Sequence, residues 1–156
     1  MDELLAIYLN DHLAGATAGV ELAKRLQGSN RDDPEFGPVL VEICAEIEAD
    51  RETLRAVMDR LGISQSKLKP LAATVGERLG RLKPNRRLLS YSPLSRLEEL
   101  ELLQVGVAGK RRLWLALEHT HGDDLSSFEL GTLAERATGQ LRRLEALHLK
   151  AASLAL

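Results

Sequence analysis

The sequence predicts an all-α fold, a bundle of four long helices with a long connection between the second and the third. Apolar residues recur at three- and four-residue spacing through four segments, each about 25 residues long, which is the period of one helical face. Hydrophobic residues make up 44% of the chain but aromatic residues only 3%, so the core must be mainly aliphatic. A chain of 156 residues fits one domain, which we expect over 1–156.

The first helix, expected over about 2–27, carries an unusual apolar stripe. The stripe includes His12 and two glycines, Gly15 and Gly19, where a plain core helix would have Leu or Ala. We interpret the glycines as sites of close approach between helices. Gly28 follows the last apolar turn and is the expected end of the helix.

The second helix is expected over about 36–61, with Gly62 as its stop. Asp50 falls in a gap in its apolar stripe, so this helix too carries an ionisable group toward the core. We expect Asp50 and His12 to meet in the bundle as a hydrogen-bonded pair that fixes helix register, because an unpaired buried charge costs several kcal/mol. Such a pair would raise the pKa of His12.

The connection that follows is strongly basic. The segment 63–96 holds eight Lys or Arg residues and one acidic residue, and we expect a short helix within it, over about 67–82. A polyanion-binding face is one interpretation. Few aromatic side chains are present to stack on bases, so nucleic acid is an unlikely partner and packing against the acidic second helix is favoured. The candidate anion-binding residues are Arg81, Lys83, Arg86 and Arg87.

The third helix is expected over 93–121, with Ser92 as its cap and a proline at its first position. Its middle part is apolar on more than one side, and Leu103, Val107 and Trp114 lie close together on the helical wheel. We expect this second apolar side to contact another copy of the chain, which predicts self-association.

The fourth helix is expected over 130–154, after a short turn that contains three possible caps, Asp124, Ser126 and Ser127. Short turns make the first and second helices, and the third and fourth, antiparallel hairpins. The long connection can carry the chain back to the other end of the bundle, so that the second and third helices run parallel.

With this architecture, the stretches 8–15 (YLNDHLAG) and 91–101 (YSPLSRLEELE) resemble an uncharacterised branch of the ferritin-like superfamily. The resemblance implies a ferritin-like four-helix bundle. Di-iron members of that superfamily need a Glu from each of two helices and a Glu-x-x-His from each of the other two. The expected second helix has no Glu-x-x-His, and the one from Glu145 to His148 lies near the C-terminus, so the usual di-iron ligands are missing.

A remnant single-metal or redox site is the alternative to the register-fixing pair. His12 and Asp50 would begin it, and residues of the last two helices would complete it. The weak candidates for those positions are Glu98, Glu101, Glu145 and His148.

No nucleophile triad, phosphate loop or dinucleotide fingerprint is present in the sequence. We therefore expect a non-catalytic interaction or scaffold protein with no cofactor. The alternatives are a degenerate metal-binding or redox bundle and a polyanion-binding protein. No secretory signal or membrane span is recognisable, so a cytoplasmic location without membrane contact is expected.

Overall fold

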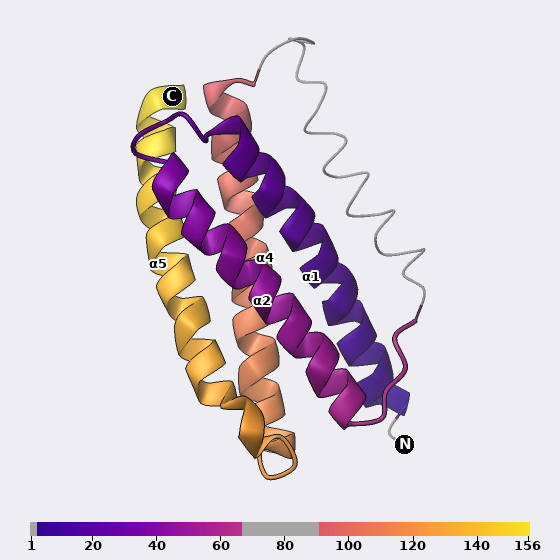
Figure 1. Cartoon of the computed structure of the whole chain (residues 1–156). Coiled ribbons are helices and arrows are strands. Elements are labelled where there is room, and N and C mark those ends of the chain that lie inside the picture. The colour runs from indigo at the N-terminus through magenta and orange to yellow at the C-terminus, as the bar shows by residue number, and fades with distance from the viewer. Residues whose placement is uncertain (1–2, 67–90) are drawn as a thin grey trace.

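The computed structural model describes residues 3–66 and 91–156, which form four helices packed against one another (Figure 1). That part of the chain contains no strand. The short helix expected over 67–82 lies outside the described residues. The four helices and one 3₁₀ turn are α1 Glu3–Ser29, α2 Gly37–Arg60, α4 Pro93–His121, η1 Ser126–Phe128 and α5 Leu130–Ala155.

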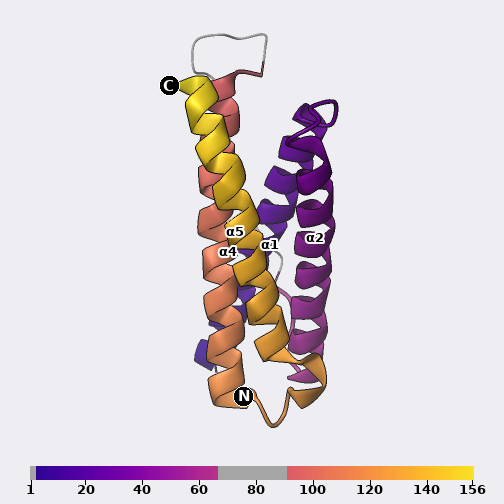
Figure 2. The ribbon, with the colours of Figure 1, turned by 90° about the vertical axis from the view of Figure 1, so that its left-hand side faces the viewer.

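The helices form two antiparallel hairpins, α1 with α2 and α4 with α5, which face each other as two layers (Figure 2). Helices α2 and α4 run in one direction, and α1 and α5 in the other (Figure 1). Helix α1 packs on α4, whereas α2 and α5 approach each other less closely. None of the described helices is long and apolar enough to cross a membrane.

The apolar core is divided into two clusters along the bundle. One cluster contains Phe36, Ile47 and Val107, and the other contains Leu54 and Trp114. The residues between the clusters include Asp50 on α2 and Lys110 on α4, so aliphatic packing is interrupted in the middle of the bundle. The functional candidates described below lie at this level.

Several helix ends follow the local signals in the sequence. The hydroxyl of Ser92 accepts a hydrogen bond from the backbone N–H of Ser95 at 3.1 Å, and this confirms the predicted cap of α4. Gly62 has a φ of 67°, a left-handed conformation that glycine adopts without strain, and it ends α2 as predicted.

Two predicted helix ends are wrong. Helix α1 continues through Gly28 to Ser29, because Asn30 closes it instead: its buried amide donates a hydrogen bond to the carbonyl of Leu26 at 2.7 Å. Helix α5 uses none of the three predicted caps. Its N-cap is Glu129, in a left-handed conformation with φ of 50° and without a side-chain cap, because η1 occupies the turn before it.

The interpretation of the small residues as close helix contacts is also wrong. Among residues 3–66 and 91–156, a Cβ placed on Gly15 or Gly19 of α1 would meet nothing within 4 Å, and the same holds for Gly106 and Gly109 of α4. These positions face open space rather than a neighbouring backbone.

Gly37 is a glycine that packing does require. A Cβ there would lie 2.8 Å from the carbonyl oxygen of Arg31 and 3.0 Å from that of Asn30. We therefore expect Gly37→Ala to lower the free energy of unfolding by about 1–3 kcal/mol, because backbone atoms must move. Chemical denaturation measures the change.

Gly28→Ala is the matched control. A Cβ at Gly28 meets nothing within 4 Å inside helix α1, so this variant should gain up to about 1 kcal/mol from helix propensity. If both substitutions change stability in the same direction, the assigned role of Gly37 is wrong.

Candidate functional site

A pocket of about 460 Å³ opens between α1, α2 and α4 at the middle of the bundle. Its volume falls in the range of roughly 300–1,000 Å³ that is usual for small-molecule sites. Small residues of α1 and α4 form part of its wall, and apolar side chains of α2 and α4 form another part. The rest is polar: Tyr8, Asp11, His12, Asp50, Arg51 and Lys110. The lining contains Gly15, Ala16 and Gly19 from α1, Ile47 and Leu54 from α2, and Leu103, Gly106, Val107, Gly109, Leu113 and Trp114 from α4.

The sequence produces this pocket through missing side chains. The two glycines of α1 and the two of α4 recur at nearly one-turn spacing, so each pair lies on one face of its helix. At most core positions of a bundle a Leu or Ile side chain fills the space between helices, but glycine has no side chain to do so. The four glycines therefore leave volume that the neighbouring helices do not fill.

The floor of the pocket holds a fully buried carboxylate. Asp50 is 1% exposed, and both of its oxygens are hydrogen-bonded. Oδ2 accepts from Nζ of Lys110 at 2.5 Å and from Nε2 of Gln140 at 3.2 Å, and Oδ1 pairs with the guanidinium of Arg136. One residue of α2 is thereby bound to both α4 and α5.

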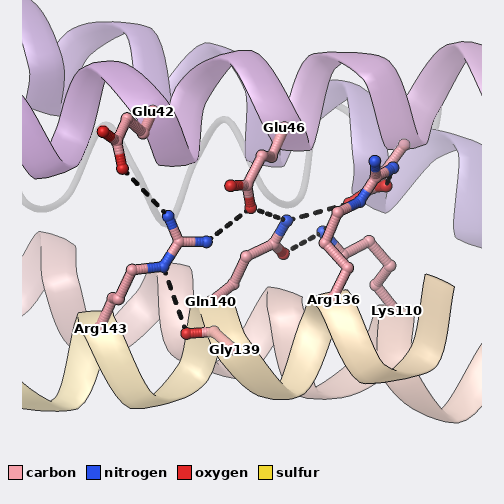
Figure 3. Close-up of polar contacts among 8 residues, drawn as sticks. Glu42, Glu46, Lys110, Arg136, Gly139, Gln140 and Arg143 are labelled. Atoms are coloured by element: carbon pink, nitrogen blue, oxygen red, sulfur yellow. Dashed lines mark hydrogen bonds and ion pairs between the residues drawn. The ribbon is translucent and has the colours of Figure 1, made fainter. Parts of the chain in front are cut away.

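The same network continues along α2 and α5. Gln140 also donates from Nε2 to Glu46 at 2.9 Å, and its Oε1 accepts from Lys110 at 2.5 Å. Arg143 reaches Glu46 at 2.6 Å and Glu42 at 3.6 Å (Figure 3). The seam between α2 and α5 is thus bridged by long polar side chains, which suits the wider separation of these two helices.

Burial shifts the pKa values of the network in a way that the geometry explains. Desolvation lowers the pKa of Lys110 from its ordinary value, and the contact with Asp50 opposes that shift only in part. Burial alone would raise the pKa of Glu46, but the hydrogen bonds from Arg143 and Gln140 outweigh it and lower the pKa.

Two side chains of the lining have more N–H groups than hydrogen-bond acceptors among the described residues. The indole N–H of Trp114 has no hydrogen-bond partner among the described residues, although Trp114 is 1% exposed and lines the pocket. The ammonium of Lys110 has three N–H groups and donates to two acceptors, Asp50 and Gln140. An unpaired buried donor costs about 1–3 kcal/mol, and the indole nitrogen of Trp114 is itself enclosed by the protein rather than open to the pocket.

His12 lines the same pocket as Asp50, but the two do not form the predicted pair. No hydrogen bond or ion pair joins them among residues 3–66 and 91–156, because the oxygens of Asp50 are taken by α4 and α5. Burial lowers the pKa of His12, and the nearby charge of Asp11 only partly opposes this. The prediction of a raised pKa is therefore wrong. The imidazole instead packs edge-on against the ring of Tyr8, with centroids 4.6 Å apart.

The weak metal candidates do not come together at the pocket. Nε2 of His148 and Oε1 of Glu101 form a surface ion pair at 3.0 Å, Glu145 is exposed and Glu98 is half-buried. Across the described ranges, no group of three or more His, Cys, Asp or Glu side chains has metal-binding proximity. The alternative of a metal site begun by His12 and Asp50 therefore has no complete set of ligands among the described residues.

The second apolar side of α4 is also buried within the chain itself. Leu103 and Val107 are each 2% exposed and join one core cluster, and Trp114 joins the other. These three residues face the core and the pocket, so they do not form the outer surface on which the expectation of self-association rested.

A second buried acid escaped the sequence analysis. Glu99 is 5% exposed and pairs through Oε1 with Arg25 at 2.9 Å, while Oε2 accepts from the hydroxyl of Tyr91 at 3.3 Å. Burial raises the pKa of Glu99 and raises the pKa of Tyr91 to about 12. The signal was available, because Glu99 falls between two apolar positions on the buried side of the predicted helix.

The acidic residues of α2 find their counter-charges within the described residues. Arg143 serves Glu42 and Glu46, and Lys24 of α1 binds Glu48 at 2.8 Å. Packing of the basic connection against α2 is therefore not needed to neutralise it. The anion-binding candidates Arg81, Lys83, Arg86 and Arg87 lie outside the described residues.

No protein-family model, curated protein or solved structure matches the chain.

The first prediction of the site concerns Asp50. Replacing it with Ala leaves Lys110 and Arg136 facing each other without a counter-ion, and we expect a loss of about 3–5 kcal/mol in the free energy of unfolding. Glu48→Gln, which removes an exposed ion pair that solvent screens, should change it far less. Equal losses in the two variants would contradict the central role of Asp50.

The second prediction distinguishes a His12 whose pKa is lowered by burial from a His12 whose pKa is raised by pairing with an acid. A proton NMR titration should give a pKa below the ordinary value, with the His12 resonance identified by its loss in His12→Gln. Because the folded state then binds fewer protons than the unfolded state, this histidine makes stability rise with pH up to the unfolded pKa of about 6.5. A value above 6.5 would restore the pairing with an acid.

Proposed function

We propose that this protein is a non-catalytic binding protein whose central pocket holds a small, largely apolar molecule. The observation that carries the proposal is the pocket of about 460 Å³ between α1, α2 and α4, walled by glycines that no packing requirement explains. The proposed role is still binding rather than catalysis, but the partner is a small molecule in the pocket instead of another protein on the surface of α4.

The chemistry of the lining supports a ligand rather than ordered water. Leu, Ile, Val and Trp side chains together with Gly and Ala make up most of the lining, and the polar side chains of Tyr8, Asp11, His12, Asp50, Arg51 and Lys110 make up the rest. Sites for small organic molecules share this composition, in which apolar walls supply affinity and a few polar atoms fix orientation. Asp50 serves as part of the scaffold here, because both of its oxygens are bound by protein donors.

We further propose a ferritin-like arrangement for the bundle. Its support is the combination of helix directions, with α2 and α4 parallel, and the long connection between them (Figure 1). Ferritin-like bundles build their sites between facing helices in the core, which is where this pocket lies.

Intrinsic fluorescence offers a direct test, because Trp114 is the only tryptophan in the chain and it lines the pocket. We expect a neutral apolar probe, N-phenylnaphthylamine, to bind with micromolar affinity and to quench Trp114 by energy transfer. A titration followed by both fluorophores measures the dissociation constant.

Gly109→Leu should reduce this binding at least tenfold, because its side chain enters the space that the glycine leaves open. Gly28→Leu places the same side chain on α1 away from the pocket and should leave binding unchanged. If wild-type protein does not bind the probe, or if both variants bind it equally well, the proposed function fails.

A further inference from the structure

We propose that the molecule bound in this pocket is an amphipathic amine, whose ammonium group lies at the mouth against Tyr8, Asp11 and His12 while its hydrocarbon part fills the space beside the glycines. This inference rests on the proposed binding function and assigns the chemical class of the ligand. The polar side chains of the lining carry it, because they differ in whether the protein itself supplies their partners.

Four of the described side chains in the lining are charged, and the protein neutralises three of them. Asp50 and Lys110 pair with each other, and Arg51 pairs with two glutamates of its own helix. Asp11 has neither an ion-pair partner nor a hydrogen bond to its carboxylate among residues 3–66 and 91–156. The unmatched charge of the lining is therefore negative, and a cation on the ligand complements it.

The unmatched carboxylate lies at the exposed end of the pocket. Tyr8 is 36% exposed and Asp11 is exposed, whereas Asp50 is 1% exposed. An ionic head group bound near Tyr8 and Asp11 keeps part of its hydration, so it avoids the large cost of burying a charge. The hydrocarbon body then extends inward along the glycines of α1 and α4, where it gains free energy by leaving water.

The side chains around Asp11 also suit a cation. Tyr8, Asp11 and His12 are three and four residues apart, so they share one face of α1, and all three line the pocket. The aromatic ring of Tyr8 attracts cations through its face. Burial lowers the pKa of His12, so its imidazole is neutral at pH 7 and has a nitrogen that can accept a hydrogen bond from an ammonium group. A carboxylate in the same place would be repelled by Asp11.

The test uses three competitors with the same hydrocarbon chain and different ends: decylamine, decanol and decanoate, each below its micelle concentration. They are compared by displacement of N-phenylnaphthylamine from wild-type protein at pH 7 and low ionic strength. We expect decylamine to displace the probe at concentrations about fivefold lower than decanol, and decanoate to be the weakest, because only the ammonium group is attracted by an exposed carboxylate and an aromatic ring. The preference for decylamine should shrink in about 0.5 M salt, which screens exposed charges.

One substitution assigns the preference to the named carboxylate. Asp11→Asn keeps the shape of the side chain and removes its charge, so decylamine should then bind within about twofold of decanol, while the decanol affinity stays as in wild-type protein. Glu21→Gln is the matched control, because it removes the same charge from an exposed position of α1 that does not line the pocket. This variant should keep the full preference for decylamine.

The outcomes separate this inference from the function on which it rests. Equal or tighter binding of decanol or decanoate, with the probe bound normally, overturns the amine assignment and leaves the binding function intact. A decylamine preference that survives Asp11→Asn, or that Glu21→Gln abolishes as well, also overturns it. Failure of every apolar compound to bind removes both proposals together.

Discussion

The structure depends on one buried carboxylate. Asp50 is enclosed at the middle of the bundle, and it is stabilised only because α4 supplies Lys110 and α5 supplies Arg136 and Gln140. A charge in such a place is costly unless its partners are held in position. The hairpins must therefore meet in one register, since a shift by one helical turn would separate Asp50 from donors on two helices at once.

This constraint accounts for the pocket beside it. The apolar core is divided at the level of Asp50, so the aliphatic clusters stabilise the two ends of the bundle while a polar network holds the centre. Because ion pairs rather than interdigitated Leu and Ile define the spacing there, glycines can line the neighbouring face without collapse of the helices. The charged network and the open space are two consequences of the same departure from uniform packing.

Local signals in the sequence were sufficient for the helices but not for the site. The cap at Ser92, the stop at Gly62 and the burial of Asp50 depend on neighbours in the chain and were predicted correctly. The partners of Asp50 were not, because arginine on an amphipathic helix usually marks a solvated face, and Arg136 is 86 residues away. The glycines misled for a different reason: a missing side chain is compatible with close contact or with empty space, and only the opposing helix decides between them.

The contacts of the α2–α5 seam form only between the two hairpins. Each hairpin joins helices that are neighbours in sequence apart from a short turn, whereas the seam joins residues at least 86 positions apart, the separation of Asp50 and Arg136. Closing a loop of that length costs conformational entropy before any of these bonds can form. These contacts exist only between the two hairpins, so they stabilise the docked bundle and not either hairpin alone.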